Sequence, residues 1–148
     1  MDKYQIMEQQ GRDKFKRLCD KLGREWHPNP NEMDYYDGTV YHNGKTYLIE
    51  IKNRDAECDK YPTIIYEVEK HNNLIQTITD TGADGGYYVT FIGDTAWTYD
   101  ITLPYIDELP IYTMKCNRHT AEDDIKVNKS VRFLPKEGNN VHIYTIND

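Results

Sequence analysis

Apolar positions recur at helical spacing in the first part of the chain. From Lys3 to Leu22 they lie three or four residues apart and form one stripe, which contains Tyr4, Gly11, Phe15, Leu18 and Leu22. Charged residues lie mostly on the other side, as in an amphipathic helix packed on a core. Gly23 follows, and glycine commonly ends a helix because it adopts left-handed backbone angles at no steric cost. We therefore predict a helix from Lys3 to Leu22.

The following segment, residues 24–33, shows no such period and contains Pro28 and Pro30. Proline lacks a backbone N–H and blocks helix continuation, so we expect a loop here. This loop connects two elements and does not mark a domain boundary.

Polar and apolar residues then alternate on both sides of the dipeptide Asn43-Gly44. The two alternating runs span residues 37–41 and 46–52. A period of two residues is typical of a strand with one buried face, and Asn-Gly is the strongest local signal for a two-residue hairpin turn. We therefore predict a β-hairpin.

The turn sets the register of this hairpin. With Asn-Gly at the tip, Asp37 lies directly opposite Glu50, and the two side chains are close together on one face. Lys52 follows two residues later and points to the same side. Thr39, Tyr35, Tyr41 and Leu48 share this face, and the other face is apolar, with Val40, Tyr47, Ile49 and Ile51.

A second helix and two strands are predicted in the middle of the chain. Pro62 suits a first helical turn, and apolar residues then repeat on one side as far as Gly82, namely Ile64, Val68, Ile75 and Ile78. Residues 87–92 and 96–101 are rich in β-branched and aromatic residues, which predicts two strands. Further β-prone pieces at 111–115, 130–134 and 141–146 follow among prolines, and their organisation stays open.

This order of elements predicts an α/β domain with a mixed β-sheet, two main α-helices and extra C-terminal strands. The length of 148 residues matches one domain over residues 1–148. The chain lacks the apolar run of a signal peptide or a membrane span, so we expect a soluble, cytoplasmic protein without membrane contact. It also lacks a glycine-rich phosphate loop, a nucleophile elbow and a dinucleotide fingerprint, which leaves kinase, hydrolase-fold and dehydrogenase functions without support.

The opposed carboxylates are the candidate site. Asp37 and Glu50 repel each other at short distance, so the pair either raises one pKa or shares a cation. Mg²⁺ is the preferred candidate, with Mn²⁺ as an alternative, because it binds carboxylate oxygens, carbonyls and waters. A cation here can activate a water on a phosphate, and Lys52 can orient that water. The net charge of −7 argues against nucleic-acid binding. A bound cation would make the local charge at these carboxylates positive and weaken that objection.

The hairpin carries Asp37 and, after twelve intervening residues, Glu50-Ile51-Lys52, and a helix is predicted before and after it. This arrangement resembles the PD-(D/E)XK nuclease superfamily over about residues 4–100. The resemblance implies a restriction-endonuclease-like core in α-β-β-β-α-β order and a Mg²⁺-dependent endodeoxyribonuclease. It implies that Asp37, Glu50 and the backbone of Ile51 bind the metal and that Lys52 is catalytic. Tyr36 replaces the proline of the family name.

The resemblance also implies roles for residues on the two helices. Many members carry an acidic residue on the first helix, and Glu8 lies seven residues before Phe15, on the same stripe, which makes it a metal candidate. An ordinary carboxylate near a helix N-terminus is the alternative interpretation. A polar residue on the helix after the E-x-K strand is also common, and of Tyr66, Glu67 and Lys70 we choose Lys70. An ordinary solvated lysine is the alternative interpretation. We expect Lys70 and Arg54 to contact nucleic acid.

Three functions stay open from the sequence. The first is a metal-dependent nuclease acting on DNA, and the second is a noncatalytic module of the same fold that binds nucleic acid or a protein partner. The third is an acidic mimic of nucleic acid that engages a basic partner. One chain supplies one hairpin site, so cleavage of both strands requires a homodimer or two events. The small size and the resemblance suggest a phage or mobile-element protein.

Overall fold

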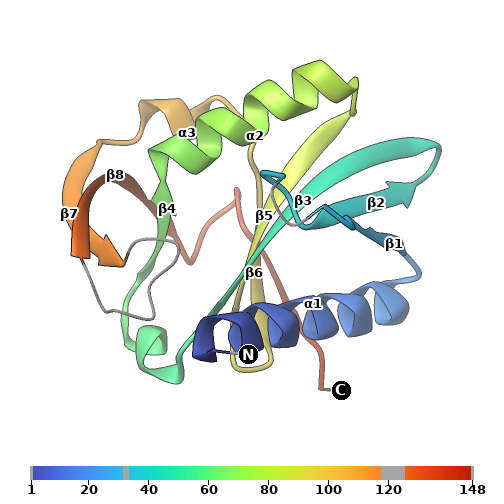
Figure 1. Ribbon diagram of the computed structural model, residues 1–148, viewed down its shortest axis with the longest axis horizontal. Helices are drawn as coiled ribbons and strands as arrows, with labels where there is room; N and C mark the ends of the chain where they lie inside the picture. Colours follow the sequence, from blue (N-terminus) through green and yellow to red (C-terminus); the bar gives the residue numbers. More distant parts are fainter. Residues whose placement is uncertain (1, 32–33, 118–125, 148) are drawn as a thin grey trace.

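The computed structural model describes residues 2–31, 34–117 and 126–147 (Figure 1). Its helices are α1 (Lys3–Leu22), α2 (Val68–Thr81), α3 (Tyr105–Glu108) and the short 3₁₀ helix η1 (Ala56–Lys60). Its strands are β1 (Glu25–Pro28), β2 (Gly38–His42), β3 (Lys45–Arg54), β4 (Thr63–Glu67), β5 (Gly85–Ile92), β6 (Thr95–Asp100), β7 (Tyr112–Asn117), β8 (Lys126–Pro135) and β9 (His142–Thr145).

The larger sheet has the strand order β1-β2-β3-β5-β6-β9. It is mixed, because β3 runs parallel to β5 while the other neighbouring strands are antiparallel. The predicted hairpin is confirmed as β2 and β3: Asn43 and Gly44 have φ angles of 52° and 75°, as a two-residue turn of this kind requires. Gly38 pairs with Ile49, which is the predicted register.

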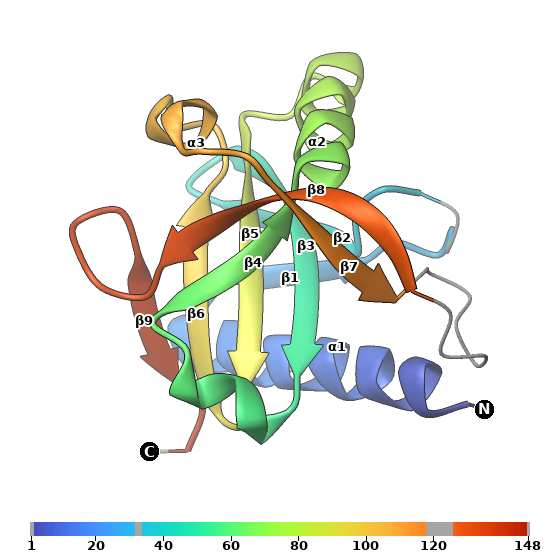
Figure 2. The same cartoon turned by 90° about the vertical axis from the view of Figure 1, so that its left-hand side faces the viewer.

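The two faces of this sheet are covered by different layers (Figures 1 and 2). Helix α1 crosses one face and contributes Phe15 and Leu18 to a core with Ile51 of β3. Helix α2 and the smaller sheet, of order β4-β8-β7, cover the other face. Tyr66 and Leu74 are buried there against the larger sheet. The expected α/β class with a mixed sheet and two flanking helices is therefore confirmed.

Two expected element boundaries are wrong. The expected loop at 24–33 contains β1, which pairs with β2 because Trp26 is anchored edge-on against Phe15 with ring centroids 4.8 Å apart. The second helix begins at Val68 rather than at Pro62. Residues 63–67 form β4 instead, since their alternating burial suits a strand that pairs with β8.

The C-terminal part supplies strands to both sheets. The β-prone pieces identified in the sequence overlap β7, β8 and β9, in that order. Strand β9 extends the larger sheet beside β6, whereas β7 and β8 build the smaller sheet with β4. Within the described ranges, no helix is both long enough and apolar enough to cross a membrane.

Candidate active site

Strand β3 continues beyond the start of β2, and this overhang carries Glu50 and Lys52. The ladder between the two strands ends at the pair Gly38 and Ile49. In the described part of the chain, residues 50–54 pair with β5 alone. The sheet edge beside Glu50 and Lys52 is therefore not covered by another strand there.

Asp37 bonds to β3 just beyond the last β2–β3 pair. Its Oδ2 accepts the backbone N–H of Ile51 at 2.7 Å, and its own N–H donates to the carbonyl oxygen of Ile49 at 2.7 Å. Oδ1 accepts both Nε and Nη2 of Arg12 from α1, at 3.1 and 3.0 Å. A backbone ladder and a charge-assisted pair thus hold Asp37 in place.

Glu50 lies on the face that α2 covers, whereas the Asp37 carboxylate reaches Arg12 of α1. The two residues are not a ladder pair as expected, because the β2–β3 register ends at Gly38 and Ile49. Its side chain is 15% exposed, and Oε1 lies 3.6 Å from Nζ of Lys70, which comes from the first turn of α2. Burial raises the pKa of Glu50, Lys70 opposes this shift, and the nearby charge of Asp37 adds to it. An ionised Glu50 is therefore costly unless further positive charge is close.

Two lysines flank this carboxylate. The Lys52 side chain reaches solvent at the open edge. The protein atoms around its ammonium group partly desolvate it, and Lys70 repels it, so the pKa of Lys52 is lowered. Burial alone would lower the pKa of Lys70 as well, but Glu50 outweighs burial and the pKa of Lys70 is raised. Lys70 is thus the charged partner of Glu50, and Lys52 is the more readily deprotonated lysine.

The donor atoms at this edge suit a hard divalent cation. The N–H and C=O of one strand residue point to the same side of the strand. The Ile51 N–H meets Asp37, so its carbonyl also points toward this edge. Two carboxylates and a carbonyl are the ligands that Mg²⁺ and Mn²⁺ prefer. The described residues contain no group of three or more His, Cys, Asp or Glu side chains arranged to hold a metal, so waters and substrate would complete the coordination.

The other expected site residues lie elsewhere. Glu8 is exposed rather than on the buried stripe, because burial of α1 begins only at Gly11. The Arg54 guanidinium is turned into the protein, where Nη2 donates to the Ile65 carbonyl oxygen at 2.9 Å and to the Tyr88 hydroxyl at 3.2 Å. Of the residues expected on helices or beyond the E-x-K motif, only Lys70 contacts the carboxylate pair.

Arg12 is a site residue that the sequence reasoning missed. It follows Gly11, where α1 comes so close to β3 that an added Cβ would lie 3.1 Å from the Asn53 Cβ and 3.2 Å from the Ile51 side chain. This close approach brings the guanidinium to Asp37. The sequence does contain one indication of this role. Arg12 directly follows a glycine of the buried stripe, and a charge close to a buried face requires a partner.

The chain matches no protein-family model and no curated protein sequence. Among solved structures, it is similar to the Holliday junction resolvase of the archaeal hyperthermophile Archaeoglobus fulgidus, with 12% sequence identity and a TM-score of 0.49. The similarity covers 85% of this chain and 91% of the resolvase.

Proposed function

We propose that this protein is a metal-dependent nuclease of the PD-(D/E)XK superfamily that hydrolyses phosphodiester bonds in DNA. The observation that carries the proposal is the placement of two neighbouring carboxylates, Asp37 and Glu50, and Lys52 where β3 continues beyond its pairing with β2. The position of this edge between α1 and α2 agrees with the superfamily resemblance of the sequence. Phosphodiester hydrolysis needs a cation, an activated water and a positive group near the phosphate, and these residues can supply or hold all three.

Each residue has a distinct part in this proposal. Asp37, Glu50 and the Ile51 carbonyl would hold Mg²⁺ or Mn²⁺. When bound, the cation supplies a water of lowered pKa and neutralises charge on the phosphate. Lys52, with its lowered pKa, orients the attacking water or donates a hydrogen bond to a phosphate oxygen. Lys70 holds Glu50 and reduces the cost of its charge.

One hairpin site cuts one strand at a time. Cleavage of a duplex at one position therefore requires either a homodimer, which brings a second site, or two successive events. We propose an endonuclease, as the resemblance of the sequence to the superfamily implies.

Substitution of Lys52 is the direct test. We expect wild type to cleave plasmid, linear duplex or single-stranded DNA in Mg²⁺ or Mn²⁺ but not in EDTA. Lys52→Ala should lose activity by at least about 100-fold, the usual effect of removing a group that assists proton transfer. Lys45→Ala is the matched control, since Lys45 is an exposed lysine of the same hairpin.

Circular dichroism and thermal unfolding should show that both variants fold like wild type. Full activity of Lys52→Ala would remove Lys52 from the site. Absence of cleavage by wild type on every DNA form would contradict the nuclease proposal.

A noncatalytic module of the same fold is the second candidate. Two observations favour it: Arg12 already satisfies Asp37, and the net charge is −7. Such a module would bind nucleic acid or a protein partner through the same face. Calorimetric titration with millimolar Mg²⁺ separates the candidates, because only the nuclease requires cation binding at Asp37 and Glu50.

A further inference from the structure

The guanidinium of Arg12 occupies one oxygen of the Asp37 carboxylate, which is a proposed metal ligand. A carboxylate has about four lone-pair positions. On Asp37, Arg12 takes two of them through Nε and Nη2 on Oδ1, and the Ile51 N–H takes one on Oδ2. A divalent cation on Asp37 would therefore lie next to a guanidinium, and like charges at this distance repel.

We propose that Arg12 is the counter-ion of Asp37 in the metal-free protein and that a divalent cation displaces it toward a phosphate of the substrate. This inference rests on the proposed function. It makes Arg12 a competitor of the metal before binding and a contact for the DNA backbone after it. Guanidinium groups bind carboxylates and phosphates with the same paired geometry, so one group can serve both partners.

The structure allows this exchange without movement of the backbone. Close packing at Gly11 holds α1 on β3, so the proposed exchange would take place by rotation of the Arg12 side chain. That side chain is 26% exposed, and Asp37 is 18% exposed. The guanidinium can therefore turn to solvent without burying its charge. Asp37 keeps its position, because the Ile51 N–H and its own backbone bond hold it independently of Arg12.

The alternative is that Arg12 only orients Asp37 for the metal, and the two roles predict opposite effects on cation affinity. Removal of an orienting residue weakens cation binding, whereas removal of a competing charge strengthens it. Isothermal titration of Ca²⁺ and of Mg²⁺ into the protein at constant ionic strength measures this sign without relying on catalysis.

We expect Arg12→Gln to bind both cations more tightly than wild type by at least about threefold, the effect of losing one partly screened charge. Arg12→Lys keeps a charge and should stay closer to wild type. Arg17→Gln is the matched control on the same helix, since Arg17 donates to Asn147 instead. Unchanged or weaker cation binding by Arg12→Gln would overturn the inference while leaving the nuclease proposal intact.

Two further measurements complete the test. In wild type, the Arg12 Nε–Hε NMR cross-peak should shift when Mg²⁺ is added, and an unmoved peak at saturating Mg²⁺ contradicts displacement even if Arg12→Gln folds poorly. In Ca²⁺, Arg12→Gln should bind a labelled DNA duplex more weakly than wild type, although it binds Ca²⁺ more tightly. If neither protein binds any cation, the proposed function fails together with this inference.

Discussion

At the scale of single residues, Gly38 shows how tightly the position of Asp37 is specified. A Cβ at Gly38 would lie 2.4 Å from the His27 carbonyl oxygen and 2.4 Å from the Trp26 ring. Trp26 cannot withdraw, because it packs edge-on against Phe15 of α1. We expect Gly38→Ala to lower the free energy of unfolding by about 1–3 kcal/mol, as for other overpacked sites. Cleavage should fall too, because Asp37 moves with its strand.

Urea denaturation and the DNA cleavage assay measure both effects. Gly85→Ala is the control, since its Cβ would meet only the half-buried Tyr47 ring at 3.2 Å, and a side chain can shift. Equal stability of Gly38→Ala and wild type would show that β1 adjusts without displacing Asp37.

The sequence predicted the residues of the carboxylate pair but not all of their partners. Asp37, Glu50 and Lys52 belong to one hairpin, so its two-residue turn alone predicts that they lie near one another. Arg12 reaches Asp37 only through the docking of α1 on β3, a contact between segments 25 residues apart in the chain. Periodicity identifies the buried stripe of a helix but not which strand it packs against.

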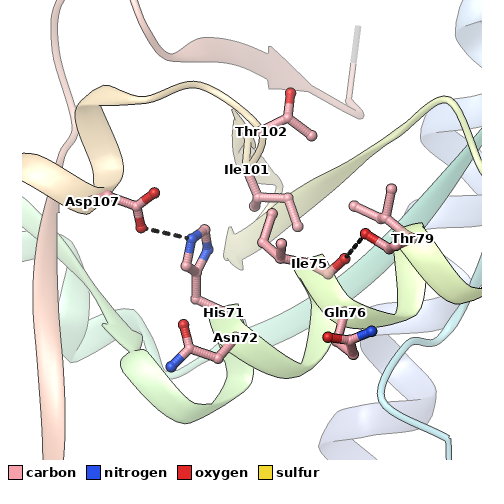
Figure 3. A pocket seen from close by; sticks show the side chains of 9 residues that line it. His71, Asn72, Ile75, Gln76, Thr79, Ile101, Thr102 and Asp107 are labelled. Atoms are coloured by element: carbon pink, nitrogen blue, oxygen red, sulfur yellow. Dashed lines mark hydrogen bonds and ion pairs between the residues drawn. The ribbon is translucent and has the colours of Figure 1, made fainter.

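At the scale of secondary-structure elements, His71 connects α2 with its two neighbours. Its Nδ1 lies 3.1 Å from the Tyr66 hydroxyl of β4. Its Nε2 lies 3.3 Å from Asp107 of α3 (Figure 3). Burial lowers the pKa of His71, Asp107 opposes this, and Arg132 adds to it. The unfolded chain, with a histidine pKa of about 6.5, then takes up a proton before the folded protein does.

The stability contributed by neutral His71 is therefore complete above about pH 6.5 and is lost as the pH falls through the lowered pKa. We expect the unfolding free energy of wild type to decline more steeply between about pH 7 and pH 5 than that of His71→Gln. His142→Gln serves as the control, because His142 is exposed. Urea denaturation across this pH range measures the slopes, and parallel slopes for wild type and His71→Gln would contradict the assignment.

The same elements show where sequence patterns fail. Pro62 and the spacing of Ile64 and Val68 suit a helix, yet residues 63–67 form β4 because pairing with β8 buries Ile64 and Tyr66. β8 lies about seventy residues further along the chain, so no local window contains the partner that decides between helix and strand. The helix α1 and the β2–β3 hairpin were predicted because caps and turns within each segment specify them, such as Gly23 with φ 69°.

At the scale of the whole molecule, a net charge of −7 must be reconciled with the proposed DNA substrate. Arg12 and Lys70 are engaged with Asp37 and Glu50, so without a cation the proposed site would present two carboxylates to DNA. Bound cations reverse the sign of such a site. DNA binding should therefore depend on divalent metal even when no cleavage occurs.

We expect the affinity of wild type for a labelled duplex to rise by at least about tenfold when millimolar Ca²⁺ replaces EDTA at fixed ionic strength. The variant Asp37→Asn with Glu50→Gln should bind DNA more tightly than wild type in EDTA, because it lacks two negative charges and leaves Arg12 and Lys70 unpaired. The same variant should not respond to Ca²⁺, since it lacks the ligands. Fluorescence anisotropy measures the DNA affinity of both proteins in EDTA and in Ca²⁺. A double variant that still gains affinity from Ca²⁺ would place the cation, and with it the phosphate-binding surface, away from the β2–β3 hairpin.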